Sequence, residues 1–405
     1  MGSPLMRRAY LVLWFGQFAA IGGLTVVVPL LPFYLSEGLG VPEADVPWWT
    51  GVSLAAPAVT QMITAPLWGM IGDRYGSKAM VVRAHAGLAL SVGLMALADT
   101  PGEFLGYRLL QGVCGGVVGA TATFASALAP TARRGRALGG LFGAVAAGSL
   151  VGPLLGSLLA SRFGYGALFG SVAALLAVSS LLALVLLREP ANPSHRTSAP
   201  GPAAPTLRAV AGQLLRTGQS KHLLLAGLAA QAGAYALVVV FAPRVGQISG
   251  SIAAATVWVG ALQAATWAAS LVGGPWWGYR NDRHLPQLGF TLAAAGCGLA
   301  VALQALPTAA AALLPMRIAQ GFCFAALIPS VAHVVCKVVP EQARGTSLGI
   351  THGVLDLGQV VGPLLGALAA ALLPLPWAFT AIGLFFALST VLAARSTRAA
   401  RAEPA

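Results

Sequence analysis

Three short segments in the first half of this chain recur, in the same order, in the second half. The pairs are 66–74 with 275–283, 108–114 with 317–323, and 152–156 with 362–366. The first two pairs are displaced by 209 positions (66 to 275 and 108 to 317) and the third by 210 (152 to 362). Matches in register over half the chain predict a duplicated structural unit. If the chain lies in a membrane, two parallel copies of one helical bundle indicate a transport path between them.

Composition places the repeat in a lipid bilayer. Hydrophobic residues make up 57% of the 405 positions and charged residues only 9%, against roughly 25% charged residues in an ordinary soluble domain. A helix needs about 20 apolar residues to cross the hydrocarbon core. Runs of this kind are predicted at 11–34, 48–71, 79–98, 102–129, 137–161, 165–187, 222–245, 252–278, 286–306, 308–337, 345–372 and 376–394. We therefore expect an all-α integral membrane protein with twelve transmembrane helices in two pseudo-symmetric six-helix bundles.

The basic residues predict how the spans are oriented. If both termini are cytoplasmic, twenty of the 24 Lys and Arg residues fall on the inner side. Only Arg162 and Arg244 fall outside, and Arg108 and Arg317 lie within helices. This asymmetry follows the positive-inside rule, so we expect a multi-pass protein of the cell membrane (the inner membrane in a bacterium) with both termini cytoplasmic. The net charge of +13 then faces the anionic inner leaflet rather than a nucleic acid, which would need a soluble basic domain.

One polar segment divides the chain. Residues 188–221 contain prolines at 190, 193, 200, 202 and 205, which block regular structure. We expect an N-terminal six-helix bundle over 1–187, a cytoplasmic linker loop over 188–221, and a C-terminal six-helix bundle with a short basic tail over 222–405. The sequence contains no nucleotide-binding loop, nucleophile motif or metal-ligand spacing, so it predicts no enzyme, no metal site and no cofactor. Energy for transport would come from a proton gradient.

A glycine-rich loop joins the second and third predicted spans. Its sequence over 69–78, Gly-Met-Ile-Gly-Asp-Arg-Tyr-Gly-Ser-Lys, resembles the signature loop of the major facilitator superfamily and implies the major facilitator fold. The residues carried over as a gating loop are Gly69, Gly72, Asp73, Arg74, Gly76 and Lys78. The resemblance implies that the carboxylate of Asp73 docks at the N-terminal end of the eleventh helix when the inner gate is shut, because unpaired amides there favour an anion. Alternatively, these charges are merely solvated.

The fourth and tenth spans each contain an arginine. Arg108 begins the sequence Arg-Leu-Leu-Gln-Gly, which resembles the superfamily motif of the fourth helix, and Arg317 begins its repeat. An arginine inside a span costs about 2.5–3.5 kcal/mol on insertion scales, so it normally faces a cavity or a partner. The resemblance implies a role in proton transfer for Arg108 and, through the repeat, for Arg317. Alternatively, both side chains snorkel to the outer interface.

A third motif lies in the fifth span. Gly148, Gly152, Pro153 and Gly156 resemble the antiporter motif of drug exporters, which within the superfamily favours export over import. Glycines four residues apart also let helix backbones approach closely. Because the motif recurs at 358–366, it could equally be a packing element of both halves. Together the motifs make nearly the whole chain similar to twelve-span drug:proton antiporters.

Asp356 is the one acidic residue that lies deep in a predicted span. It follows His352 by one helical turn, so the two side chains share a face, and His333 lies on the preceding span. A membrane carboxylate beside an imidazole can carry a proton. We therefore predict that these three residues, with Arg108 and Arg317, couple transport to protons. The alternative is a static ion pair between Asp356 and Arg317.

The first span carries Gln17 at the depth where many proton-driven exporters of cationic drugs carry an acid. Interior arginines and histidines outnumber the one deep carboxylate, a balance that favours neutral or anionic cargo over cations. Further candidate residues of a substrate cavity are Gln61, Gln231, Tyr235, Gln263 and Trp267. Each of them could instead be an interhelical hydrogen bond or a packing contact.

The sequence therefore predicts a proton-coupled secondary transporter that exports small organic molecules by alternating access, of the multidrug type. The alternative is a dedicated exporter of one endogenous metabolite, such as a carboxylate siderophore. An importer and a transporter-like receptor are less favoured. The expected partners are a small-molecule substrate and the lipid bilayer, and the chain is expected to act as a monomer.

Overall fold

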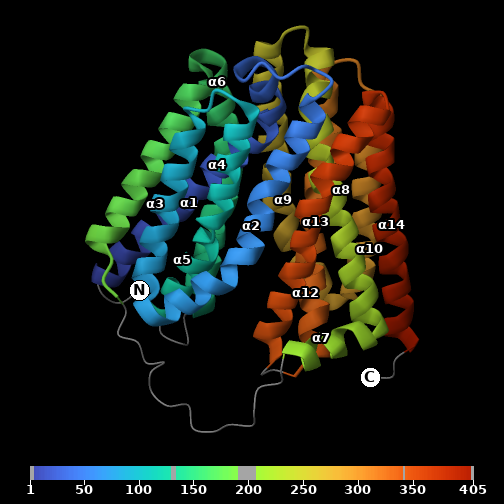
Figure 1. The fold of residues 1–405 in the computed structure, drawn as a ribbon. Coiled ribbons are helices and arrows are strands. Elements are labelled where there is room, and N and C mark those ends of the chain that lie inside the picture. The colour runs from blue at the N-terminus through green and yellow to red at the C-terminus, as the bar shows by residue number, and fades with distance from the viewer. Residues whose placement is uncertain (1–3, 129–133, 190–206, 341–342, 403–405) are drawn as a thin grey trace. The chain divides into compact units, whose positions relative to one another are not determined.

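The computed structural model of the chain is all-helical (Figure 1). The residues that the structure describes are 4–128, 134–189, 207–340 and 343–402. The chain forms two compact units. Unit 1 contains Met1–Thr197 and Ile252–Ala264, and unit 2 contains Ser198–Ser251 and Ala265–Ala405. The boundary at Thr197 falls inside the predicted linker.

Unit 1 contains the helices of the first repeat. They are α1 (Pro4–Phe33), the π-helix η1 (Tyr34–Gly38), α2 (Val46–Tyr75), α3 (Ser77–Met95), α4 (Pro101–Val113), α5 (Val117–Leu128) and α6 (Arg134–Leu186). The long helix α6 contains the predicted fifth and sixth spans. It kinks between them at Gly164, whose φ of 82° and ψ of 173° are a backbone conformation that favours glycine.

Unit 2 contains the helices of the second repeat, although the first turns of α9 are grouped with unit 1. They are α7 (Leu207–Arg216), α8 (Gly218–Ser249), α9 (Ile252–Arg283), α10 (Pro286–Leu303), the 3₁₀ helix η4 (Ala310–Leu313), α11 (Leu314–Phe324), α12 (Leu327–Val338), α13 (Arg344–Leu372) and α14 (Leu375–Ala402). Helix α7 lies in the range predicted as a loop. It begins only after the last proline of that range, and it buries Val210 and Leu214, one turn apart, on a single face.

Ten helical stretches of the described chain are long and apolar enough to cross a membrane. One of them, Gly143–Leu186, covers two predicted spans across the kink at Gly164, and the other nine each cover one. The remaining predicted span, 48–71, lies in α2, which is 30 residues long but is not among the ten. The described helices therefore account for the twelve predicted spans by position.

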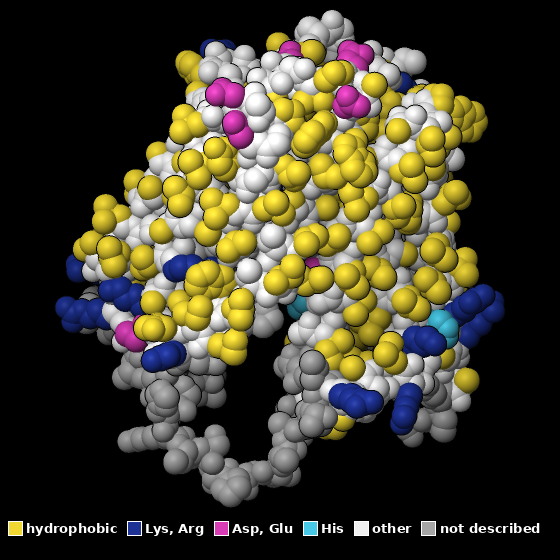
Figure 2. Space-filling model, viewed as in Figure 1, with side chains coloured by type: hydrophobic (Ala, Val, Ile, Leu, Met, Phe, Trp, Pro, Cys, Tyr) yellow, Lys and Arg dark blue, Asp and Glu magenta, His cyan; other side chains and the backbone are white. Residues whose placement is uncertain are grey.

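In each unit the basic side chains gather at one end (Figure 2). In unit 1, Arg7, Arg74 and Lys78 lie where α1 begins, α2 ends and α3 begins, which we call the basic end of unit 1. The acidic side chains of Asp45 and Glu103 lie at the opposite end, where α2 and α4 begin. The basic residues at one end of unit 2 are Arg208, Arg216, Lys221, Arg280, Arg283, Lys337, Arg395, Arg398 and Arg401. This is the distribution expected if both basic ends face the cytoplasm.

Candidate functional site

Each repeat contains a helix that is interrupted partway along its span. Three residues separate α4 from α5, and two residues separate α11 from α12. The first interruption contains Gly115 and Gly116, and Gly116 has a φ of 96°, in the region that favours glycine. Interrupted helices inside a membrane leave backbone amides and carbonyls exposed, and in transporters such helix ends form substrate and ion sites.

An arginine precedes each interruption, and its side chain bonds to a glutamine one turn later. Arg108 is 4% exposed, and its Nη1 donates to Oε1 of Gln111 at 2.6 Å, while its Nε donates to the carbonyl oxygen of Ser53 at 2.9 Å. Arg317 is 3% exposed, and its Nη1 donates to Oε1 of Gln320 at 2.9 Å. The repeated Arg-x-x-Gln spacing therefore joins two side chains across one helical turn. Because both arginines are buried, the structure does not favour the snorkelling alternative.

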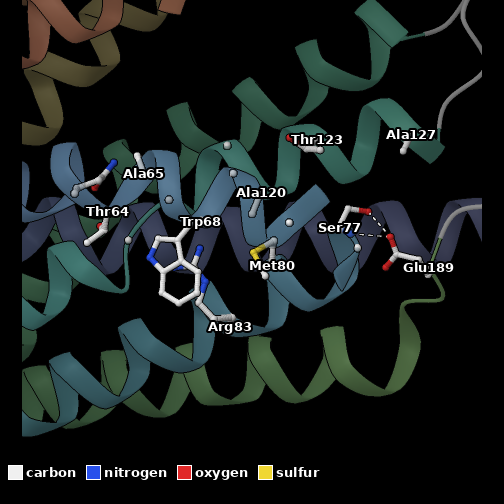
Figure 3. Close-up of a pocket in the computed structure, with 17 residues that line it drawn as sticks. Thr64, Ala65, Trp68, Ser77, Met80, Arg83, Ala120, Thr123, Ala127 and Glu189 are labelled. Atoms are coloured by element: carbon white, nitrogen blue, oxygen red, sulfur yellow. Dashed lines mark hydrogen bonds between the residues drawn. The ribbon is translucent and has the colours of Figure 1, made fainter. Parts of the chain in front are cut away.

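Unit 1 contains a pocket of about 610 Å³ beside the first interruption (Figure 3). Its walls come from α2, the turn after it, α3, α5, the residues between α4 and α5, and Glu189, which lies just after α6. The side chains that line it include Gln61, Thr64, Trp68, Arg83, Thr123 and Glu189. Glycines contribute a large part of the remaining wall, so backbone groups are accessible from the pocket. The pocket thus combines one cation, one carboxylate, several hydroxyl and amide groups, and exposed backbone.

Arg83, on α3, is the cation that lines this pocket. Its guanidinium stacks on the ring of Trp68, 3.8 Å from the ring centre, and its Nη1 donates to the carbonyl oxygen of Cys114 at 3.2 Å (Figure 3). The indole Nε1–H of Trp68 donates to the carbonyl oxygen of Val113 at 2.7 Å. Both side chains therefore satisfy carbonyls at the interruption. Arg83 is not evident as a site residue from the sequence, because it falls among the inner charges of the positive-inside pattern; its position within the predicted span 79–98 is the one usable signal.

The gating-loop residues lie at the basic end of unit 1, where α2 passes into α3. Gly76 makes this turn with a φ of 91°. The carboxylate of Glu189, just after α6, accepts hydrogen bonds from the backbone N–H groups of Ser77 and Lys78, both at 2.7 Å, and from the Ser77 hydroxyl at 2.9 Å. A side chain at Gly76 would collide with this carboxylate, since its Cβ would lie 2.8 Å from Cδ of Glu189. Glu189 therefore caps the N-terminus of α3, although it lies 112 positions after Ser77 in the chain.

The other gating-loop residues lie around this cap. Gly69 and Gly72 line the pocket, and the exposed guanidinium of Arg74 lies 5.6 Å from the ring centre of Tyr75. The side chain of Asp73 lies outside the described residues. Its docking at the eleventh helix stays a prediction.

Glu189→Gln is expected to lower the thermal stability of the purified protein. The amide removes the negative charge at the helix N-terminus and leaves only one oxygen to accept from Ser77 and Lys78, and loss of such a cap costs about 0.5–2 kcal/mol. The measurement is thermal unfolding in detergent. Glu43→Gln, at an exposed acid of the opposite end, is the matched control and should unfold as the wild type does. Equal unfolding temperatures for all three proteins would contradict the cap.

The helix-five motif lies on α6 and packs against α1 in unit 1. A Cβ on Gly152 would collide with the carbonyl oxygen of Gly22, and Gly148 and Gly156 make similarly close approaches to α1. Pro153 is buried beside them. In unit 2, a Cβ on Gly362 of α13 would collide with the carbonyl oxygen of Ala232 of α8. The motif thus acts as a packing surface in both copies, the alternative that the sequence left open; its role in export stays a prediction.

Asp356 lies on α13 in unit 2 and is partly buried. Its Oδ1 accepts a hydrogen bond from Nε2 of Gln359 at 2.7 Å, and its carboxylate interacts electrostatically with His352 and with Tyr235 of α8. The structure therefore brings together residues that the sequence assigned separately to coupling and to the substrate cavity. His333 is partly buried on α12.

Two candidate cavity residues belong to α1 and α2. Gln17 is 1% exposed, and its Oε1 accepts a hydrogen bond from the hydroxyl of Thr121 at 2.5 Å. Gln61 is exposed and lines the pocket of unit 1. Gln17 is thus held in place by Thr121 of α5, whereas Gln61 is accessible to a small molecule.

The remaining cavity candidates lie on α8 and α9. Gln231 is buried on the face of α8 that meets α13, because a Cβ on Gly358 would lie 2.7 Å from Cβ of Gln231. Gln263 and Trp267 are partly buried on α9. A substrate role for these residues stays a prediction.

Residues 13–313 and 223–405 match the sequence family described as the Major Facilitator Superfamily. The chain belongs to this superfamily. It is therefore a multi-pass membrane protein that acts as a secondary transporter of small molecules, not an enzyme. The resemblance drawn from the gating loop and the arginine motif is confirmed.

Similar proteins include two kinds of transporter. The chain is 38% identical over 398 residues to the staphyloferrin B transporter of Staphylococcus aureus (strain NCTC 8325 / PS 47), covering 98% of this chain and 94% of that protein. It is 28% identical over 371 residues to the multidrug resistance protein MdtG of Proteus mirabilis (strain HI4320), covering 89% and 88%.

The fold is shared with solved transporter structures. A bacterial homolog of the human lysosomal transporter Spinster, in an inward-facing and unoccupied conformation, has a TM-score of 0.78 and 16% identity, covering 99% of this chain and 98% of that one. The nucleoside transporter NupG has a TM-score of 0.76 and 14% identity, covering 98% and 100%. At these identities the likeness confirms the major facilitator fold and nothing further.

Proposed function

We propose that this chain is a proton-coupled exporter of a carboxylate siderophore. The observation that carries the proposal is the 38% identity to a staphyloferrin B transporter over 98% of the chain. The likeness to MdtG is lower, at 28% over 89% of the chain. Dedicated export of one endogenous metabolite is therefore favoured over broad drug efflux.

The charge balance within the spans supports an anionic cargo. Arg83, Arg108 and Arg317 lie in spanning helices, whereas Asp356 is the one described acid more than a turn from the end of such a helix. A membrane interior with excess positive charge stabilises a carboxylate more than a cation. A siderophore that binds iron through carboxylates fits this balance.

The source of energy and the direction of transport are part of the proposal. Asp356, beside His352, is the candidate proton carrier, and protons moving inward would drive the cargo outward. Export is favoured by the likeness of the helix-five motif to that of drug exporters. Both basic ends then face the cytoplasm, with both termini on that side.

Broad multidrug export is the second candidate function. It is supported by the likeness to MdtG, which extends over 89% of this chain and 88% of that protein. The two candidates differ in the expected phenotype of a deletion strain.

Deleting the gene is expected to remove one iron-binding polycarboxylate from the medium of iron-starved cells. Its concentration inside the cells should rise, because synthesis continues while export is blocked. Mass spectrometry of medium and cell extracts from deleted and complemented strains measures this. A panel of unrelated drugs is tested on the same strains as the control for multidrug export. Unchanged siderophore levels combined with broad drug sensitivity would overturn the proposal in favour of the second candidate.

A further inference from the structure

We propose that the pocket of unit 1 binds a carboxylate of the transported molecule, through the guanidinium of Arg83 and the first turn of α5. The inference rests on the proposed function for the identity of the cargo, but the pocket itself is defined by this structure. It names a binding site that lies wholly within unit 1 and does not depend on the placement of unit 2.

Arg83 has unfilled hydrogen-bonding capacity. Within the described residues, its Nε–H is buried and has no acceptor, and one nitrogen, Nη1, donates to the carbonyl oxygen of Cys114. No described carboxylate pairs with its charge; its stacking partner is the neutral ring of Trp68. A guanidinium in a membrane span without a counter-ion is destabilising. A bound carboxylate would supply the missing charge and accept from two nitrogens at once.

The N-terminal end of α5 lines the same pocket. Part of the wall is formed by Gly116, the residue before α5, and by Gly119, in the first turn of α5. The first amides of a helix have no acceptor within the helix, and they carry a partial positive charge. Because glycine has no side chain, these amides are open to a ligand. An anion in the pocket would therefore meet Arg83 and a helix N-terminus together.

The pocket extends along unit 1 toward its basic end. The wall extends from Gln61, midway along α2, to Ser77 and Glu189 at the basic end. Glu189 is the one described acid in the wall, and both of its oxygens already accept hydrogen bonds from α3. Its charge is thus compensated by the helix that it caps. The pocket reaches the end of the unit that is predicted to face the cytoplasm, where an exported molecule enters.

The repeat offers an internal comparison. With the displacement of 209 positions (83 to 292), the second copy has Leu292 in place of Arg83, and Leu292 is exposed. The arginine is therefore not needed to build an interrupted helix of this fold, because α11 and α12 are interrupted without it. Its presence in unit 1 alone points to a ligand rather than to the architecture.

The test is equilibrium binding of radiolabelled citrate, a simple tricarboxylate, to the full chain in lipid nanodiscs. The wild type should bind citrate saturably and should ignore the uncharged trimethyl ester as a competitor. Arg83→Gln should weaken citrate binding by about tenfold to a hundredfold, the range expected for hydrogen bonds to charged groups. Arg83→Lys should recover part of this loss, because it keeps the charge but not the two-nitrogen geometry. Arg283→Gln, which removes an exposed arginine stacked 4.0 Å from the ring centre of Tyr279, is the matched control and should bind as the wild type does.

A second pair of variants keeps Arg83 and its contacts intact. Gly119 lines the pocket, and a Cβ there would meet no atom within 4 Å, so Gly119→Leu should narrow the pocket without strain and abolish citrate binding. Gly106→Leu on α4 is the control, since a Cβ at Gly106 also meets nothing within 4 Å and Gly106 does not line the pocket. This pair separates a binding role of the pocket from a purely structural role of Arg83.

The outcomes distinguish this inference from the proposed function. Saturable citrate binding that is lost in both Arg83→Gln and Gly119→Leu supports the carboxylate site, even if the medium of the deletion strain contains its normal siderophore. No saturable binding by the wild type, or equal binding by the wild type and these two variants, overturns the site even if siderophore export itself is confirmed.

Discussion

Asp356→Asn is expected to abolish proton-driven export while leaving the amount of folded protein unchanged. Asparagine has nearly the same shape as aspartate, and its Oδ1 can still accept the hydrogen bond that Gln359 donates at 2.7 Å. Local packing should therefore persist. What the amide cannot do is bind and release a proton, so the cluster of Asp356, His352 and Tyr235 loses its candidate carrier.

The measurement is siderophore uptake into everted membrane vesicles, with and without an imposed pH gradient. The wild type should accumulate the substrate only with the gradient. Asp356→Asn should fall to the background of empty vesicles with the gradient, yet it should still exchange labelled for unlabelled substrate across the membrane. Exchange does not require net proton movement, so its persistence separates coupling from binding.

Two further variants sharpen this expectation. Asp356→Glu keeps a titratable carboxylate and should retain part of the driven uptake. Asp99→Asn, at an exposed acid outside the candidate spans, is the control and should leave uptake unchanged. Full gradient-driven uptake by Asp356→Asn would show that protons are carried elsewhere.

The sequence predicted the architecture because every helix that crosses a membrane must be apolar over most of its length. Apolar runs locate the spans, and the repeat of 108–114 at 317–323 divides them into two sets. The ends of the helices were less well predicted, because an apolar run ends at the first charged residue whereas the helix itself can continue past that residue. The last span was predicted to end at 394, but α14 continues to Ala402 with Arg395, Arg398 and Arg401 in its final turns, where cations favour a helix C-terminus.

The interruption of the fourth span was not predictable from local sequence. Gly115 and Gly116 lie in the apolar stretch 112–120, and glycine alone does not break a transmembrane helix. The carbonyl oxygens at the break accept hydrogen bonds from Trp68 and Arg83, which are 45 and 31 positions away along the chain. A pattern within one span carries no information about such partners.

The cap on α3 was hidden for the same reason. Glu189 and Ser77 are 112 positions apart and meet because α6 packs against α3. Glu189 is the first acid of the predicted linker 188–221, and nothing in the sequence around it indicates a cap. By contrast, the pairing of Arg108 with Gln111 was within reach, because both residues lie on one helix three positions apart.

Gly152→Ala is expected to destabilise the protein, although alanine favours helices in general. The new Cβ would collide with the backbone of Gly22, so α1 and α6 must separate, and overpacking of this kind costs about 1–3 kcal/mol. Gly170→Ala on the same helix meets nothing within 4 Å and should instead gain the roughly 0.5–1 kcal/mol that alanine has over glycine in a helix. Opposite shifts of the unfolding temperature for two identical substitutions on α6 are the expected result.

Gly152→Leu extends the same argument to the function of the helix-five motif. The larger side chain cannot be accommodated by a small separation, and we expect no monodisperse protein in size-exclusion chromatography, whereas Gly170→Leu should behave as the wild type does. Because Gly362 meets Ala232 of α8 in the same way, Gly362→Leu should fail equally. If the motif sets the direction of transport rather than packing, Gly152→Ala would stay stable and lose only driven export. The close contacts in both copies indicate that the motif packs helices in each half, so a role in the direction of transport would act through this packing.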